Sequence, residues 1–467
     1  MFCCFLTDAD GHHKITMCKG ASGSFMCAKC TNVVSKKELQ AGSPFVHYTC
    51  GDWTKIKGLT PERLLQLMAH LRAQKAILGK GAFDDLQQAA GWNFSEHSLV
   101  CSDMAIIADI PDSVFWDWQH SLCSSGGSAQ YELNQVLVRV KKINPELIGT
   151  LDGFKTNVVF PKTNAQHARW TFEERMVDKR NAHIKAFASE VLSMVVVLNL
   201  WAQLTLKPTG HLLQEVECLE LLGRILFLLR LGDKVLTRLS LLAQLVQQHH
   251  DLFVSLYEEE AKPKLHFMLH IPRLFAWFKK NLSCFVTERK HRQSKKWGAF
   301  CYNLMCDTML RKTLREHLLY FKQPYSVDSV RLEPPGGIHK RFVAGKLQRW
   351  LPLLMSNRLL PPGAQPQAVF ANQVSCPAGT MTHGDLAVWS CGGSVHAGFI
   401  HTFCRLRAEP DETYAIVLVL KNLGGARCSR KTSDTHDACV HLSVMVGVFP
   451  YFARGHTVYL VASADAL

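Results

Sequence analysis

The chain has 467 residues, of which 47% are apolar and 20% charged, a composition that excludes a largely disordered protein and allows roughly two to four domains. Lys and Arg total 53 against 39 Asp and Glu, so the formal net charge is +14, which permits a polyanionic partner such as DNA or RNA without requiring one. The 17 cysteines lack the dense, even spacing of a secreted disulfide scaffold, so we expect an intracellular, reducing compartment.

Residues 1–50 read as a short α/β segment. An apolar strand over Phe2–Thr7 ends at Asp8, and a Gly/Ser-rich turn follows with the CxxC pair of Cys27 and Cys30. Such a pair can supply half of a tetrahedral zinc site. Because the chain opens on a strand that looks like the middle of a sheet, we expect a protein truncated at its N-terminus.

Residues 51–260 are dominated by helical periodicity, and we expect an all-helical insertion domain there. Thr60 is a good N-cap, and Pro61 suits the first position of the helix that follows. The stretch Ala186–Leu206 approaches membrane-spanning length but contains Glu190 and other polar residues. A buried helix is therefore predicted, and no membrane partner.

The remaining chain divides into three expected parts. Residues 261–322 should return to the N-terminal α/β core, and the Pro/Gly-rich stretches within 323–368 mark a linker. Residues 369–467 contain short β-type runs separated by turns, which predicts a small, all-β, barrel-like domain. Its cysteines and histidines follow no metal-ligand spacing, so we interpret them as structural.

A second half for the zinc site is available far along the chain. His266 and His270 are four residues apart, so they share a face of a helix, and they would also share a face of a strand. With Cys27 and Cys30 they make a Cys2His2 set for structural Zn²⁺. The entropic cost of closing a loop grows only with the logarithm of its length, so a structural zinc can offset this cost even for so long a loop. The alternative is an incidental CxxC and two histidines that serve packing.

Three acids have sequence neighbours that make them candidate site residues: Asp8 at the strand end, Asp117 three residues before His120, and Glu288 among Lys and Arg. Carboxylates that converge from distant segments can bind Mg²⁺ or Mn²⁺ for phosphodiester chemistry. Bases after Glu288 would contact DNA phosphates; they are Arg289, Lys290, Arg292, Lys295 and Lys296. Taken singly, each acid better suits a surface or capping position.

The segments "TDADGHHKITMCKGASGSFMCAKC", "WDWQH", "KPKLHFMLHIP" and "FVTERKHR" follow the order of motifs in CACTA (En/Spm-like) DDE transposases, and the chain resembles that family. The resemblance covers residues 4–50, a patch around Asp117 and residues 262–297. More distantly, the chain resembles the V(D)J recombinase catalytic core. The fold that the resemblance implies is α+β: an incomplete ribonuclease H-like core, interrupted by a large all-helical insertion and followed by the small C-terminal β domain.

The resemblance also implies roles for individual residues. Asp8 would be the second metal-binding carboxylate, and Glu288 the third. Asp117 and His120 would form the D-x-x-H signature within the insertion, acting near the DNA during strand transfer. The zinc site that clips the insertion would comprise Cys27, Cys30, His266 and His270. DNA as partner, a nuclear location and a homo-oligomer are further implications.

Departures from the family pattern shape the expected function. The family's first catalytic acid would lie upstream of Asp8. Asp10 competes with Asp8 for the assignment, and Gln119 stands where the family usually has Met. We therefore expect a transposase-derived protein of the DDE type that acts on DNA and is inactive as it stands. The alternatives are a non-catalytic DNA-binding protein and a protein-interaction scaffold with a zinc-stapled helical domain.

Overall fold

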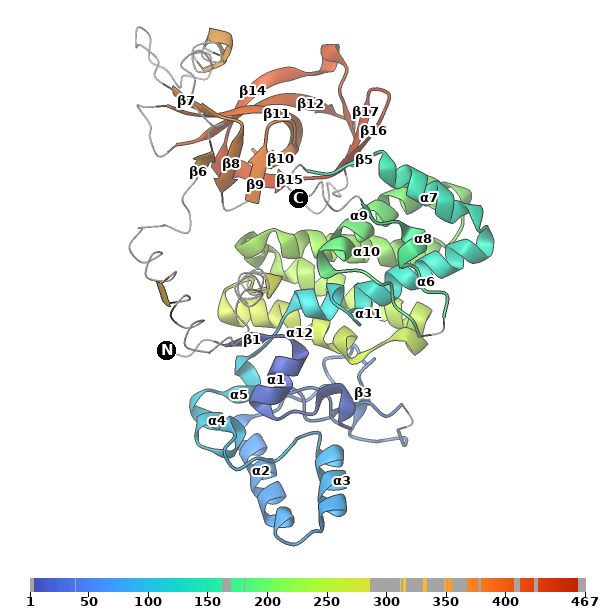
Figure 1. Cartoon of the computed structure of the whole chain (residues 1–467), viewed down its shortest axis with the longest axis vertical. Helices are drawn as coiled ribbons and strands as arrows, with labels where there is room; N and C mark the ends of the chain where they lie inside the picture. Colours follow the sequence, from blue (N-terminus) through green and yellow to red (C-terminus); the bar gives the residue numbers. More distant parts are fainter. Residues whose placement is uncertain are drawn as a thin grey trace. The chain divides into compact units, whose positions relative to one another are not determined.

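The computed structural model describes residues 4–37, 39–161, 169–179, 181–285, 311, 314–315, 331–333, 348–350, 352–354, 368–376, 379–406, 412–423 and 427–460. The chain forms two compact units: Met1–Gly149 with Thr171–Gln293, and Thr150–Trp170 with Ser294–Leu467. Helices dominate the first unit and strands the second, so the α+β class and the C-terminal β region are confirmed (Figure 1).

The first unit begins with a strand and a helix that are held beside a distant strand. β1 (Phe5–Thr7) pairs in parallel with β4 (Val114–Trp116), and Thr7 is the register partner of Trp116. α1 (Ala9–Thr16) follows β1, and His12 on this helix bonds the carbonyl of Phe115 at 3.0 Å. The CxxC turn comes next, flanked by η1 (Gly20–Ser22) and the short parallel pair β2 (Val33–Val34) and β3 (Val46–His47).

Two helices, α2 (Pro61–Lys75) and α3 (Lys80–Ala90), connect this segment to β4. Thr60 caps α2 as predicted, because its hydroxyl accepts the Arg63 amide at 3.3 Å. Gly91 ends α3 at φ +74°, a left-handed conformation that favours glycine. Three short elements complete the connection: η2 (Leu99–Cys101), α4 (Met104–Ile107) and α5 (Ile110–Ser113).

Helical elements follow β4 along the chain, and one of them, α7, crosses from the first unit into the second. They are η3 (Gln119–Cys123), α6 (Ser128–Ile143), α7 (Glu146–Thr156), α8 (Phe172–Arg175), α9 (Ala188–Thr205), η5 (Lys207–Thr209), α10 (Leu213–Arg230), η6 (Gly232–Arg238), α11 (Leu239–Tyr257), η7 (Glu258–Glu260) and α12 (Pro263–Phe278). The α12 helix packs on β4, with the Trp116 and Phe267 rings stacked at 3.9 Å.

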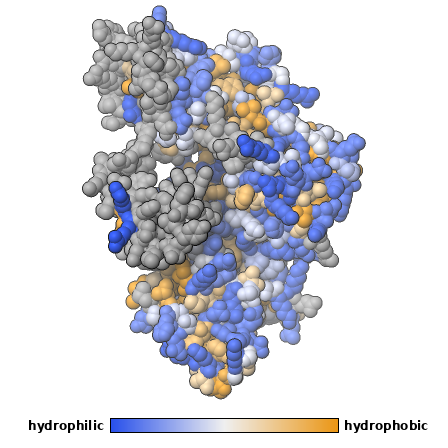
Figure 2. Space-filling view, viewed as in Figure 1, coloured by the Kyte–Doolittle hydropathy of each residue, from blue (hydrophilic) through white to orange (hydrophobic). Residues whose placement is uncertain are grey.

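The helix predicted from the most apolar stretch is α9. One helical segment of the described residues, Ala188–Thr209, is long and apolar enough to cross a membrane by length and composition. Over half of it is nonetheless buried by other parts of the protein, and Trp201 is only 2% exposed. The predicted buried helix is therefore observed. On the face drawn in Figure 2, hydrophobic residues lie in separate groups among hydrophilic ones.

The second unit is built on antiparallel strands. The main sheet has the order β15-β10-β11-β12-β13-β17-β16-β5, with β14 on β12 and β7 on β11, and a smaller sheet has the order β6-β8-β9. Their bounds are β5 (Val158–Val159), β6 (Arg331–Glu333), β7 (Ala368–Ala371), β8 (Gln373–Cys376), β9 (Gly379–Thr382), β10 (Leu386–Cys391), β11 (Ser394–Leu406), β12 (Tyr414–Asn422), β13 (Arg427–Ser429), β14 (His436–His441), β15 (Met445–Val448), β16 (Tyr451–Arg454) and β17 (Thr457–Leu460). Phe403, Val417 and Met445 help to fill its apolar core.

The prediction of an all-helical segment over residues 51–260 was wrong at two places. β4 is a fully buried strand of three residues, and its β-branched and aromatic side chains pack on both faces. β5 pairs with β16, so this short piece belongs to the sheet of the second unit. In both cases the strand forms because a partner far along the chain satisfies its backbone hydrogen bonds.

Candidate metal centre

The structure brings the four predicted Cys and His residues together inside the first unit. Cys27 and Cys30 lie on the turn after α1, and His266 and His270 lie one turn apart on α12. All four side chains are buried, and their ligand atoms lie within 4.8 Å of one another. Segments more than 230 residues apart in sequence therefore meet at one point, with donors of two types that zinc prefers.

The distances among these atoms suit a tetrahedral zinc ion. The Cys27 Sγ–His270 Nε2, Cys30 Sγ–His266 Nε2 and Cys30 Sγ–His270 Nε2 distances are each 3.5 Å. The two Nε2 atoms are 3.1 Å apart. Zn–S bonds of about 2.3 Å and Zn–N bonds of about 2.0 Å at tetrahedral angles place S and N about 3.5 Å apart and two N atoms about 3.3 Å apart. The donor set thus fits the size and geometry of Zn²⁺.

The CxxC turn is held by contacts outside the four ligands. The amide of Lys29 donates to Cys27 Sγ at 3.5 Å, which favours a thiolate at that position. The Lys29 ammonium is itself buried and donates to the carbonyls of Pro111 at 2.6 Å and Asp112 at 3.1 Å, just before β4. On the other side, the Trp53 ring meets the His270 ring edge-on, at a centroid distance of 5.3 Å. The Lys29 contacts hold the turn against α5, and the Trp53 contact holds the segment after β3 against α12.

The surroundings of the two cysteines shift their pKa values in opposite directions. Burial by itself raises the pKa of Cys27, but a hydrogen bond from Cys30 and the nearby His270 and His266 rings bring that pKa well below its ordinary value. The pKa of Cys30 is raised well above its ordinary value, because this thiol donates to Cys27 and is buried. One thiolate is therefore favoured by the protein alone, and a bound dication would favour the second.

A second predicted pair, Asp117 and His120, is also formed. Asp117 directly follows β4, and its Oδ2 accepts hydrogen bonds from His120 Nδ1 at 2.6 Å and from the His120 amide at 3.0 Å. Its Oδ1 accepts the amide of Cys284 at 3.0 Å. The Asp117 side chain is fully buried, whereas His120 is about one-fifth exposed. Asp117 lies at the carboxyl end of β4, and His120 lies on η3, the first helical element after that strand.

The segment that follows α12 runs to the carboxyl end of β4. Asn281 accepts a hydrogen bond from the Trp118 indole at 3.2 Å, and it donates to the carbonyls of Leu229 and Gly232. Three residues later, Cys284 donates to Asp117. The segment that follows α12 is therefore anchored beside the carboxyl end of β4.

Asp8 lies at the corresponding end of β1, as predicted. Because Thr7 pairs with Trp116, Asp8 and Asp117 each stand one residue beyond the paired ends of neighbouring parallel strands. The exposed Asp8 carboxylate caps α1 by accepting the Gly11 amide at 2.7 Å, whereas Asp10 lies in the first turn of that helix. Between the two competing acids, Asp8 is the one at the strand end.

Several predicted site residues lie outside the described part of the chain. They are Glu288 and the basic residues Arg289, Lys290, Arg292, Lys295 and Lys296. The same holds for most of the expected linker over 323–368 and for much of the 261–322 segment after residue 285.

One cluster of potential ligands was not predicted. Glu132 on α6, Cys218 on α10 and His249 on α11 are buried, and their ligand atoms lie within 4.8 Å of one another. These residues come from three helices and have no characteristic spacing. The only signal in the sequence is an acid, a thiol and an imidazole within strongly apolar helices.

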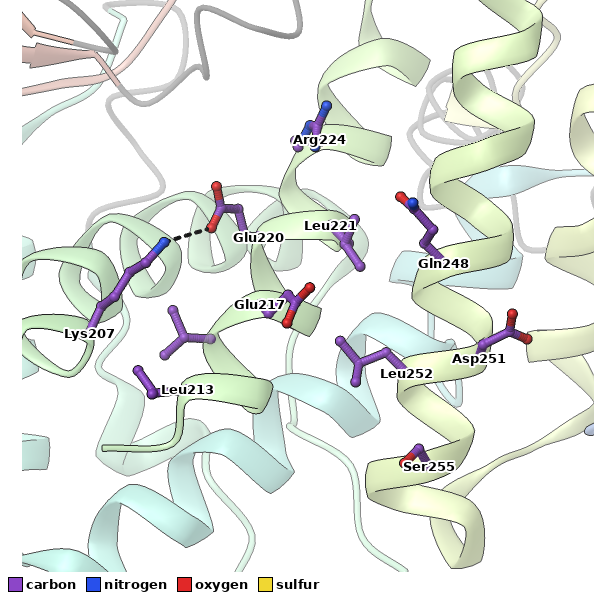
Figure 3. A pocket seen from close by; sticks show the side chains of 11 residues that line it. Lys207, Leu213, Glu217, Glu220, Leu221, Arg224, Gln248, Asp251, Leu252 and Ser255 are labelled. Atoms are coloured by element: carbon purple, nitrogen blue, oxygen red, sulfur yellow. Dashed lines mark ion pairs between the residues drawn. The ribbon is translucent and has the colours of Figure 1, made fainter. Parts of the chain in front are cut away.

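A groove of about 960 Å³ lies along α10 and α11 (Figure 3). Its charged lining residues are three acids and two bases: Glu217, Glu220, Asp251, Lys207 and Arg224. Lys207 and Glu220 form an ion pair at 3.5 Å. This mixed lining does not favour a polyanion, and none of the predicted site residues is among those that line it.

Comparisons of the chain with protein-family models, with curated proteins and with solved structures found no match.

Proposed function

We propose that Cys27, Cys30, His266 and His270 bind one structural Zn²⁺ ion that staples the N-terminal α/β segment to α12. The convergence of four buried donors at zinc-like distances carries this proposal. Four protein ligands fill every position of a tetrahedral zinc ion and leave none for a water molecule, so the ion in such a site stabilises the fold. The ion would hold β1, β4 and α12 together around the CxxC turn.

Zinc content of the purified full chain tests the staple. We expect zinc to be lost from this site in Cys27→Ser and in His270→Ala, and retained in Cys50→Ser, a matched change of a half-buried cysteine outside the site. A folded chain that takes up no zinc, or that keeps its full zinc content in both ligand variants, would contradict the proposal.

We propose further that the chain is a DDE-transposase-derived protein that binds DNA. Two observations support this beyond the resemblance. Asp8 and Asp117 end neighbouring parallel strands, the edge at which ligand sites of such sheets form. Cys284, four residues before Glu288, is hydrogen-bonded to Asp117 at that edge. The third expected carboxylate and its basic neighbours thus follow closely on an anchored residue.

Binding to duplex DNA over a range of salt concentrations tests this proposal. Replacing Arg289, Lys290, Arg292, Lys295 and Lys296 by Gln should reduce the slope of log K against log salt by up to about 4–5, since each phosphate contact contributes about 0.9. A matched control replaces five exposed bases near α2 and α3, namely Lys57, Arg63, Arg72, Lys75 and Lys80. No DNA binding at low salt, or equal loss in both variants, would contradict the proposal.

A non-catalytic DNA-binding role is favoured by how the carboxylates are used. Both Asp117 oxygens accept hydrogen bonds from the protein, and Asp8 caps α1, so each acid already serves to hold the backbone. We therefore expect DNA binding without Mg²⁺- or Mn²⁺-dependent strand cleavage. Metal-dependent nicking that is lost in Asp8→Asn and Glu288→Gln would instead establish the catalytic alternative.

A further inference from the structure

A second cluster of metal-ligating side chains lies within the helices of the first unit and shares no residue with the Cys2His2 set. Glu132 projects from α6, Cys218 from α10 and His249 from α11. Glu132 and Cys218 are 0% exposed, and His249 is 2% exposed. Their surroundings are apolar, because Cys218 packs in a cluster with Phe253, Leu265 and other buried residues.

The polar atoms of this cluster are incompletely paired. His249 Nε2 lies 2.7 Å from Glu132 Oε2, which satisfies one carboxylate oxygen. The other oxygen, Oε1, is buried and accepts no hydrogen bond from a nitrogen or hydroxyl group of the described residues, and the Cys218 thiol, a weak donor, is the further group directed to this carboxylate. The Tyr257 hydroxyl, two helical turns beyond His249 on α11, is likewise buried and without a hydrogen-bond partner in the described part of the chain. Unsatisfied buried oxygens of this kind are rare unless something else binds them.

We propose that Glu132, Cys218 and His249 bind a second divalent transition-metal ion of the zinc class. A carboxylate oxygen, a thiolate sulfur and an imidazole nitrogen are all zinc ligands, and the three donor atoms already lie within 4.8 Å of one another. On binding, the Cys218 thiol releases its proton to solvent, and His249 takes the tautomer with Nε2 unprotonated. A bound ion would replace the hydrogen bond between Nε2 and Oε2, and these two atoms, now 2.7 Å apart, would separate to about 3.3 Å to accept bonds of about 2.0 Å at tetrahedral angles.

The ion would link three helices. Because each donor comes from a different helix, the bound metal connects α6, α10 and α11 within the bundle, as the Cys2His2 ion connects the CxxC turn to α12. Three protein ligands leave one tetrahedral position, which a water can fill. Complete burial of the donors favours a structural role over catalysis.

Reconstitution of the full chain with Co²⁺ after chelation tests the proposal, since cobalt–thiolate charge-transfer absorption counts bound cysteines. We expect two ions per chain and three bound thiolates in the wild type. Cys218→Ala should bind one ion through two thiolates. The matched control Cys123→Ala, which also removes a buried thiol, should keep both ions. Far-UV circular dichroism confirms that each variant is folded, and His249→Gln provides a second disruption of the site.

The outcomes separate the two metal sites. One ion per folded wild-type chain that is lost in Cys27→Ser and unchanged in Cys218→Ala overturns the second site and leaves the first intact. Two ions in folded Cys218→Ala also overturn it. One ion that is lost in Cys218→Ala but kept in Cys27→Ser overturns the staple instead. Two ions, each lost with its own cysteine, support both.

Discussion

Cys30→Ser should destabilise the first unit severely, because it removes a cross-link that closes a very long loop. Cys30 and His266 are 236 residues apart in sequence. The chain-entropy relation for a covalent cross-link of that length gives about 5.5 kcal/mol at 25 °C. Serine is close to cysteine in size, so little of the loss comes from packing. The expected change equals a large part of a typical domain stability of about 5–15 kcal/mol.

Urea unfolding of the zinc-loaded protein, followed by tryptophan fluorescence, measures this change. Zinc chelation of the wild type should produce at least the shift seen in Cys30→Ser, because chelation also removes the proposed second ion, and Cys50→Ser should leave the midpoint near that of the wild type. Hydrogen exchange should show lost protection at the CxxC turn and along β1. A Cys30→Ser variant within about 1 kcal/mol of the wild type, or a wild type insensitive to chelation, would contradict the proposed zinc cross-link.

Three further changes test other parts of the structure. Asp117→Asn weakens the hydrogen bonds to one side-chain nitrogen and two backbone amides, so it should lower the free energy of unfolding by about 2–4 kcal/mol. The exposed Asp103→Asn is the neutral control, and equal stabilities of the two variants would contradict the prediction. Gly91→Ala should lower the free energy of unfolding by about 1–3 kcal/mol, because φ is +74° and a Cβ would lie 2.3 Å from a backbone oxygen. Gly81→Ala, with open space around it, should be neutral or stabilising. A lower thermal midpoint for Gly81→Ala than for Gly91→Ala would contradict the described loop. Burial lowers the pKa of His12 from 6.5 to about 4, so between these pH values the unfolded chain binds a proton that the folded chain does not. The contribution of neutral His12 to stability is therefore fully present above pH 6.5, and the free energy of unfolding falls by about 3 kcal/mol as the pH drops to 4. His12→Gln should flatten this part of the pH profile of stability, and identical profiles for the variant and the wild type would contradict the assignment.

Local signals in the sequence predicted those features that depend on neighbouring residues. Thr60 and Pro61 mark the start of α2, and the spacing of His266 and His270 places both imidazoles on one side of α12. The position of Asp8 at a strand end was also predictable, since a short apolar run precedes it. Each of these depends on capping or periodicity, which the sequence shows directly.

The remaining features depend on contacts between distant segments. β4 was interpreted as helix because a three-residue strand buried on both faces has neither helical nor alternating periodicity. Glu132 is core-facing on α6, but its neighbours Gln130 and Asn134 are buried too, so no polar face distinguishes it. Its relation to Cys218 and His249 follows only from how α6, α10 and α11 pack.

Zinc K-edge X-ray absorption of the folded Cys218→Ala chain identifies the ligands of the proposed Cys2His2 ion, because this variant lacks a ligand of the second proposed site. We expect two sulfur ligands at about 2.3 Å and two nitrogen ligands at about 2.0 Å. Coordination by nitrogen and oxygen alone, or a folded chain without bound zinc, would contradict it.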